Sequence, residues 1–399
     1  MRSYILLFML LTTTLCAIEK SAYNVYNETI VAKDNYTTSN NKGTTKGTYL
    51  TYYDKLDVSY YNYINDKLFI NVGAEVKYVI TGDKQKTIFF NDSSKTSVWF
   101  SNLYLSYEFY RNYYISGGIL SFKHGSYTEI SELEGSSGTG LIDIVDVDLM
   151  GMFILNKKEV LGYNVLSKIG YGYYHDDNIK NPNGTKGIYF TVDAYKNFDT
   201  IKLNYYNIDS KYKGVNLGNV QLLGLGFNKY FLKEGINVYS TLGWNHSKIN
   251  ASGAKALLKN AGISSYAPLL FPKAFNFKNN VVTDGYLLNA GIAKDIDSVI
   301  VESYNIGGSY TYTTDNWYAA TSSEYSDYMH YRFTNGDTYY TWFTTRFTTD
   351  IALKLFYGVT VNRNARAVGN SLKVVNFKDT PIPSLKRIER YGMKIIVRF

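Results

Sequence analysis

The residues that could carry out catalysis or bind a metal are few and scattered. The four histidines are His124, His175, His246 and His330, and none lies at a spacing that pairs it with a second ligand or a nucleophile. The one cysteine, Cys16, lies in the apolar start of the chain, so a chain that loses this start contains no thiol. We therefore expect no metal, no cofactor and no disulfide, and we interpret the histidines as loop or interfacial residues.

Charged side chains offer the other chemistry, and near the C-terminus they alternate with apolar residues. Lys394 and Arg398 occupy even positions, whereas every odd position from 391 to 399 is apolar, namely Tyr391, Met393, Ile395, Val397 and Phe399. A period of two places the two sets on opposite faces of one β-strand. The sequence therefore predicts a final strand with one basic face and one wholly apolar face.

The same alternation recurs along the chain. Its clearest example is Leu68 to Ile80, where seven consecutive even positions are apolar, which is a strong strand signal. Fifteen further runs bring the predicted count to sixteen strands: 22–32, 56–60, 99–109, 113–119, 144–155, 160–174, 187–196, 201–208, 220–231, 236–244, 286–293, 299–312, 337–347, 351–361 and 391–399. A count of eighteen is the alternative, with a further hairpin within 245–283 or 313–336.

The connections between these runs are of two kinds. Tight turns are predicted at 65–66, 111–112, 156–158 and 348–350, and longer polar stretches separate the next pairs; one of them, at 251–261, favours a helix. Short turns at one end and long loops at the other are typical of transmembrane β-barrels. Aromatic residues make up 17% of the chain and the mean hydropathy is −0.22, which fits strands that are apolar on one face only.

The first residues have the pattern of an export signal. Arg2 supplies a positive start, residues 4–15 are mostly apolar, and Cys16-Ala17 ends in a small residue suited to cleavage. This apolar stretch is shorter than the roughly 20 residues that a spanning helix needs. We expect a signal peptide at 1–17 and a single barrel domain at 18–399.

These features together resemble the outer-membrane porins of Gram-negative bacteria. The resemblance rests on the export signal and on the closing strand, which in those proteins ends in an aromatic residue read by the barrel-assembly machinery; Tyr391 and Phe399 stand in that strand here. It implies an all-β transmembrane antiparallel barrel in the outer membrane, with short periplasmic turns and long extracellular loops. It also implies contacts with membrane lipid and lipopolysaccharide, and a homotrimer. The length fits general and substrate-specific porins alike.

The resemblance gives a role to the third long loop, predicted at 121–143, because in general porins this loop folds into the lumen. It carries the acidic residues Glu129, Glu132, Glu134 and Asp143. Alternation directs basic residues of the last strands inward, because a charge on the lipid face costs about 2–4 kcal/mol at mid-membrane; they are Arg346, Lys354, Arg390 and Lys394. An acidic loop facing a basic wall would select ions by charge. A solvated surface loop is the equal alternative.

The expected function is a channel for diffusion of small hydrophilic solutes or ions. A structural or adhesive surface barrel is one alternative, and an outer-membrane barrel enzyme is another, which the lack of a paired histidine disfavours. The formal charge of +8 falls to about +7 without Arg2, and the basic residues are dispersed. Nothing in this pattern indicates binding to nucleic acid.

Overall fold

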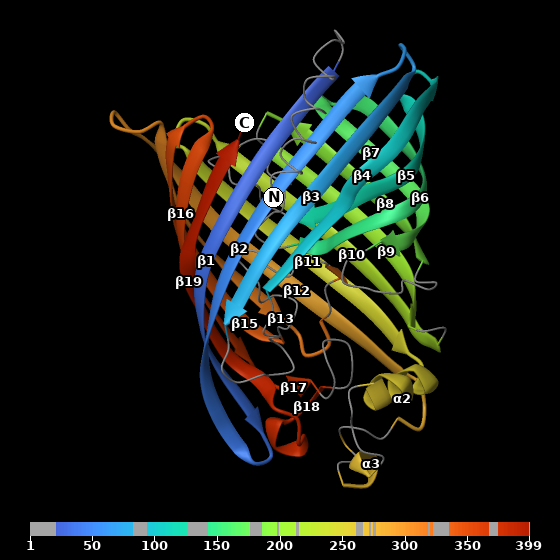
Figure 1. Ribbon diagram of the computed structural model, residues 1–399, viewed down its shortest axis with the longest axis vertical. Coiled ribbons are helices and arrows are strands. Elements are labelled where there is room, and N and C mark those ends of the chain that lie inside the picture. Colours follow the sequence, from blue (N-terminus) through green and yellow to red (C-terminus); the bar gives the residue numbers. More distant parts are fainter. Residues whose placement is uncertain are drawn as a thin grey trace.

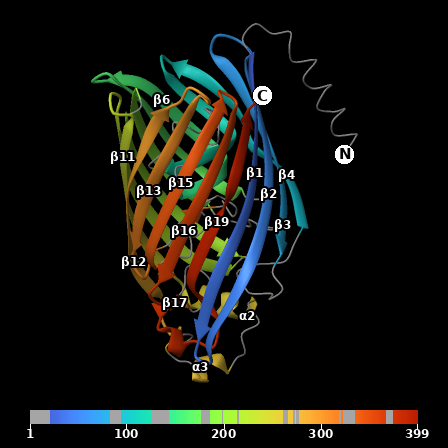
Figure 2. The same cartoon turned by 90° about the vertical axis from the view of Figure 1, so that its left-hand side faces the viewer.

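Sixteen antiparallel strands close into one barrel (Figures 1 and 2), which confirms the predicted fold class and strand count. The computed structural model describes residues 21–82, 94–125, 143–175, 186–197, 199–212, 215–260, 266–270, 273, 277–317, 320–321, 335–366 and 374–398. The barrel strands are β1 (Ser21–Asn40), β2 (Gly43–Tyr63), β3 (Leu68–Gly82), β4 (Ser94–Tyr110), β5 (Tyr113–Gly125), β6 (Asp143–Val160), β7 (Tyr163–His175), β8 (Lys186–Lys196), β9 (Asp199–Tyr212), β10 (Val215–Phe231), β11 (Ile236–Ile249), β12 (Val281–Asp297), β13 (Ser303–Thr313), β15 (Gly336–Thr348), β16 (Ile351–Asn362) and β19 (Ser384–Arg398).

The two ends of the barrel differ in their connections. One end is here called the turn end. It holds the start of β1 and the end of β19, and its connections are short turns, for example 111–112 and 349–350. The other, the loop end, holds the long connections together with two short ones, 41–42 and 213–214. The tight turn predicted at 156–158 is wrong: β6 continues to Val160, and the chain reverses at Leu161 and Gly162, both at positive φ.

The loop end carries the only described elements outside the barrel wall (Figure 1). They are the helices α2 (Ala251–Asn260) and α3 (Ala267–Leu270), the short strands β14 (Ala320–Thr321), β17 (Ala365–Arg366) and β18 (Val374–Val375), and the 3-10 turn η2 (Phe377–Asp379). The helix predicted at 251–261 is confirmed as α2. The β1–β2 hairpin projects past the neighbouring strands at this end (Figures 1 and 2).

Alternation divides every strand between an outer and an inner face. On β16 the outward Leu355 and Tyr357 are 47% and 45% exposed. The inward Lys354 and Phe356, which alternate with them, are 1% and 4% exposed. An apolar outer band is what a barrel needs where it contacts lipid. Within the described ranges no helix is long and apolar enough to cross a membrane.

The eighteen-strand alternative is wrong. The region 245–283 continues β11 and then forms α2 and α3, and the described part of 313–336 contains only the two-residue strand β14. β14 does not widen the barrel wall, because it pairs in parallel with β6, which already lies between β5 and β7.

Candidate functional site

Three of the four predicted basic wall residues lie together on the inner face, at the seam where the last strands meet the first. Lys354 on β16 lies opposite Lys394 on β19, and Arg390 on β19 lies opposite Gly358. All three side chains are at most 5% exposed. Two like charges opposite each other in a buried wall require compensation from neighbouring groups.

Carboxylates of the first strand supply that compensation. Arg390 Nε donates to Asp34 Oδ1 at 3.0 Å, and Arg390 Nη2 lies 3.5 Å from the Thr51 hydroxyl. Lys394 Nζ lies 3.3 Å from Glu28 Oε2, which also accepts a hydrogen bond from the Tyr26 hydroxyl at 2.9 Å. Arg390 and Lys394 are therefore neutralised by β1, across the pairing that closes the barrel.

Lys354 is held in a different way. Its ammonium lies 5.5 Å from the ring centroids of both Tyr340 and Trp342 on β15. A desolvated cation over an aromatic face gains about 2 kcal/mol or more. Lys354 thus stands at the boundary between an ion-paired part of the inner wall and an aromatic part.

The ion pairs continue onto the next two strands. Lys55 on β2 lies 3.4 Å from Glu75 of β3 and 3.7 Å from Asp57. Lys55 and Glu75 are each 5% exposed. We call the inner faces of β16, β19, β1, β2 and β3 the charged wall. It holds acidic residues that the sequence analysis missed: Glu28, Asp34, Asp57 and Glu75.

The fourth predicted basic residue lies apart from this group. Arg346 is two residues nearer the turn end than Thr344, the residue opposite Lys354. Its Nε lies 3.6 Å from Glu302, in the turn between β12 and β13. Arg346 is therefore a residue of the turn-end mouth.

Most of the predicted acidic loop lies outside the described residues. Glu129, Glu132 and Glu134 belong to this undescribed part. The structure assigns 121–125 to β5, so the connection is 126–142, and Asp143 begins β6 opposite Gly125. At its tip this hairpin leaves the wall: β4 pairs with β5 only as far as Ile119, and β7 pairs with β6 only from Asp148.

The free edge of this hairpin tip contacts a segment from the far side of the barrel. Ala320 and Thr321 of β14 pair in parallel with Val145 and Asp146 of β6. β14 belongs to the connection between β13 and β15, and β7 to β12 separate β6 from β13 in the wall. The contact therefore joins opposite walls across the loop end of the lumen.

Another part of the inner wall, on β9 to β13 and β15, is built mainly from uncharged polar and aromatic side chains, and we call it the neutral wall. Its inward charged residues, which include Lys202, Asp295 and Arg346, lie toward the turn end. Trp342 Nε1 donates to Asn305 Oδ1 at 2.6 Å. Asn289 Nδ2 donates to Thr311 Oγ1 at 3.0 Å.

The outer face of β1 departs from the apolar pattern of the other strands. Asp54 points outward from β2 between the outward Tyr52 and Leu56, so it lies within the apolar band. Asn27 Nδ2 and Thr29 Oγ1 donate to Asp54 Oδ1 at 3.1 and 2.9 Å. A carboxylate at this depth is costly, because lipid tails offer it no hydrogen bond.

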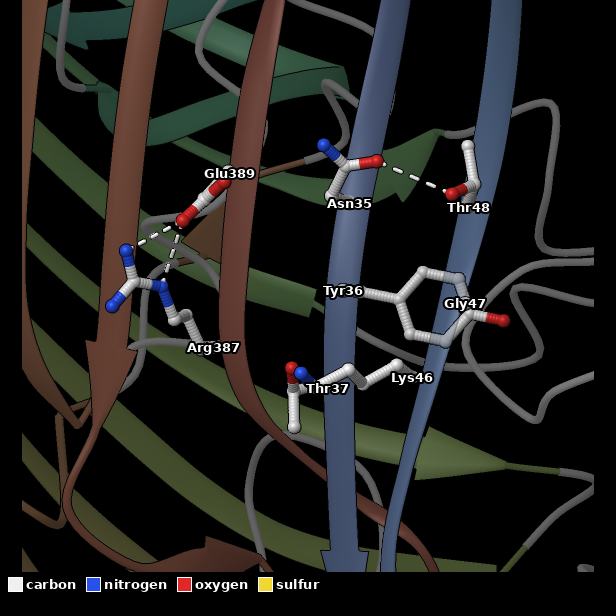
Figure 3. A pocket seen from close by; sticks show the side chains of 8 residues that line it. All are labelled: Asn35, Tyr36, Thr37, Lys46, Gly47, Thr48, Arg387 and Glu389. Carbon is white, nitrogen blue, oxygen red and sulfur yellow. Dashed lines mark hydrogen bonds and ion pairs between the residues drawn. The ribbon is translucent and has the colours of Figure 1, made fainter.

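Further outward polar residues continue toward the loop end. Lys33 lies 5.9 Å from the ring centroid of Tyr391. Nearer the loop end a hollow opens, where Thr48 donates to Asn35 at 3.2 Å and Arg387 pairs with Glu389 (Figure 3). We call this set the polar stripe: Asn27, Thr29, Lys33, Asn35, Thr48, Asp54, Arg387 and Glu389.

One histidine has a partner that the sequence did not indicate. His246 Nδ1 lies 3.0 Å from Asp284 Oδ1 on the outer face, and Trp244 stacks on its ring with centroids 6.1 Å apart. This corrects the expectation that no histidine is paired. In the part of the chain that the structure describes, no hydroxyl or thiol is hydrogen-bonded to His246, and no cluster of three metal-binding side chains occurs.

Comparison with known proteins identifies the fold. No protein-family model and no curated protein matches the chain. The structure of Pseudomonas putida OprB at high pH matches with a TM-score of 0.53 and 8% identity, over 97% of this chain and 96% of that one. This chain is a porin-like β-barrel. The anion-selective porin from Comamonas acidovorans, at 12% identity over 95% of this chain and 100% of that one, gives a TM-score of 0.49. At these identities the likeness concerns the fold.

Proposed function

We propose that this porin-like barrel forms a water-filled outer-membrane channel for small hydrophilic solutes or ions. The observation that carries the proposal is the contrast between its two faces. The outer face presents apolar side chains, whereas the inner face holds ion pairs, amides and hydroxyls around a closed wall. A polar interior inside an apolar exterior is the arrangement that a transmembrane pore requires.

The test is electrical. Purified protein reconstituted in a planar lipid bilayer should give stable single-channel conductance. Folding is checked independently by heat-modifiable mobility on a gel, which separates folded barrels from unfolded chain. Protein that is folded by this measure but carries no current would contradict the channel function.

We extend the proposal to charge selectivity. The acidic residues Glu129, Glu132, Glu134 and Asp143 would line a constriction with Lys354, Arg390 and Lys394 on the facing wall, and Arg346 would add a positive charge at the turn-end mouth. The carboxylates beside Arg390 and Lys394 support a weaker field from that wall than the basic residues alone would give. Reversal of the three glutamates to lysine should shift the reversal potential in a salt gradient. An unchanged reversal potential would remove this loop from the constriction.

The proposal assigns no catalytic role to the chain. Among the residues that the structure describes, the closest approach to a catalytic pair is His246 with Asp284, which lies on the outer face. A barrel hydrolase would need a nucleophile within about 3 Å of that histidine. Lipase and protease assays on refolded protein should show no activity that depends on His246.

The proposed location follows from the same arrangement. Residues 1–17 would act as the export signal, the turn end would face the periplasm, and the loop end would contact lipopolysaccharide. The barrel-assembly machinery would recognise the closing strand, with Tyr391 on its outer face, together with Phe399, which follows it in the sequence and lies outside the described residues. Deletion of Phe399 should lower the amount of folded barrel in the outer membrane, measured by the fraction of heat-modifiable protein.

We further propose a homo-oligomer, a trimer in the porin manner, in which the polar stripe faces a second copy. A second copy in the same membrane places its own stripe at the same depth, and the stripe carries both signs of charge, so basic residues of one copy can pair with acidic residues of the next around a three-fold axis. Cross-linking with a bismaleimide, which joins one introduced cysteine per copy across a gap, tests this. Thr29→Cys should give cross-linked dimers, whereas the matched control Leu288→Cys, outward on β12, should not. Equal cross-linking at both positions would contradict the assignment.

A further inference from the structure

Five aromatic rings form a continuous patch on the inner face at the turn end of β2 to β5. Phe69 is its centre, with ring centroids 5.2 Å from Tyr61, 5.7 Å from Tyr63, 6.2 Å from Tyr104 and 5.9 Å from Tyr114. Tyr61 and Tyr63 also contact each other edge to face, at 5.1 Å. We call these five residues the mouth platform.

The inward direction of the mouth platform follows from the register. Phe69 lies between Leu68 and Ile70 on β3, and both of these belong to the apolar outer face. Tyr104 lies between Leu103 and Leu105, which are 38% and 46% exposed on the outside. The platform therefore lines the lumen where the passage meets the turn end.

Its rings are more exposed than four other inward aromatic rings. Tyr189, Tyr206, Tyr239 and Tyr340 are at most 1% exposed and pack into the wall. All five platform residues are half-buried, so part of each ring remains available to a solute. Beside them, Ser106 and Ser116 are buried and hydrogen-bonded to each other, so only small side chains line the inner wall next to Phe69.

The surroundings of the platform favour an uncharged, hydroxyl-bearing ligand. The nearby charges are already engaged: Lys157 lies 5.7 Å from the ring centroid of Tyr114, and Glu108 accepts a hydrogen bond from the Asn112 backbone at 2.7 Å. Asn71, between Tyr61 and Tyr104 in the register, has a buried side-chain oxygen, so the polar groups that the platform itself offers to a solute are its tyrosine hydroxyls. Hydroxyls beside flat apolar faces match a molecule with hydroxyls around a C–H face.

We infer that the mouth platform is a binding site for neutral sugars on their way through the channel. The C–H face of a pyranose ring packs on Phe69 and its neighbours, gaining dispersion contacts and covering apolar surface. Its hydroxyls hydrogen-bond to the tyrosine hydroxyls. This inference rests on the proposed channel function, and it names the class of solute that the passage retains longest.

The experiment is single-channel recording with maltotriose added on the turn-end side. Maltotriose should interrupt the current in a concentration-dependent manner. Phe69→Leu, which keeps apolar volume but removes the ring, should weaken this block by about tenfold, as loss of one stacking partner does. Phe69→Tyr should retain the block. Ile70→Ala, one residue away on the outer face, should leave the block unchanged and is the matched control.

The outcomes separate this inference from the channel function. Steady conductance without any block by maltotriose, or a block that Phe69→Leu leaves unchanged, would overturn the sugar site and leave the channel standing. A stronger block by the uncharged aromatic probe N-acetyltryptophanamide than by maltotriose would also overturn the sugar assignment. Absence of conductance from folded protein would overturn both. Heat-modifiable gel mobility of each variant shows that it is folded before recording.

Discussion

The charged wall and the neutral wall solve the same problem in different ways. Both fill the inside of the barrel with buried polar groups. In the charged wall most ions pair with an ion of opposite sign, and at the seam the Asp34–Arg390 pair joins residues 356 positions apart. In the neutral wall the partners are close in sequence, as with Asn289 and Thr311, which are 22 positions apart on adjacent strands.

The difference teaches where the barrel depends on closure. A hairpin that forms locally brings Asn289 and Thr311 together, whereas Asp34 and Arg390 meet only when the last strand pairs with the first. An ion pair left half-made in a buried site is costly, while an amide or hydroxyl finds other partners more easily. The charged wall therefore makes incomplete barrels unfavourable at the seam, and the neutral wall stabilises each hairpin independently.

The largest loss of stability should come from removing one partner of an ion pair at the seam. Arg390→Met takes from the buried Asp34 its ion-pair partner at 3.0 Å, and removal of one partner of a buried pair costs about 3–5 kcal/mol. We expect the variant to unfold at clearly lower urea concentration than the wild type, measured by heat-modifiable gel mobility in detergent.

The matched control for this change replaces both charges. The double variant Asp34→Asn with Arg390→Gln keeps hydrogen-bonding groups at both positions and leaves no uncompensated charge. Its free energy of unfolding should lie well above that of Arg390→Met. Equal stability of Arg390→Met and the wild type would show that the two walls do not differ at the seam.

The sequence predicted the sixteen strands because nearly all of them carry an apolar outer face that alternation detects. It also predicted the inward direction of Lys354, Arg390 and Lys394, since Lys354 and Lys394 each lie between apolar outward residues and Arg390 shares the phase of Lys394. It did not predict their partners. On β1 the inward residues Tyr26 and Ile30 are apolar while the outward ones are largely polar, so the usual phase rule is reversed there.

Other features lay beyond a pattern of period two. β14 consists of two residues, too few for any periodic signal, and its contact with β6 depends on how two distant connections meet. The Tyr340 and Trp342 rings beneath Lys354 come from a neighbouring strand whose register the sequence does not fix. The five aromatic residues Tyr61, Tyr63, Phe69, Tyr104 and Tyr114 likewise come from four strands, and only the completed register brings them together.

An intermediate effect should come from the boundary between the two walls. Trp342→Phe removes the donor of the buried 2.6 Å hydrogen bond to Asn305, and a buried acceptor left without its donor costs about 1–3 kcal/mol. Urea titration should give a loss in that range, smaller than for Arg390→Met. Phe343→Leu, on the outer face of the same strand, is the control and should change stability less. A loss as large as that of Arg390→Met would mean that this boundary depends on a single contact as strongly as the seam does.

The smallest effect should come from within the neutral wall. Thr311→Val removes the hydroxyl that accepts from Asn289 at 3.0 Å, but the Asn289 amide keeps its second bond, to the Tyr310 carbonyl at 3.2 Å. We expect a loss of about 0.5–1.5 kcal/mol in the free energy of unfolding. The double variant Asn289→Leu with Thr311→Val replaces both partners by apolar groups and should recover part of that loss. If Thr311→Val instead cost as much as Arg390→Met, neutral partners would be as irreplaceable as charged ones, and the distinction between the walls would fail.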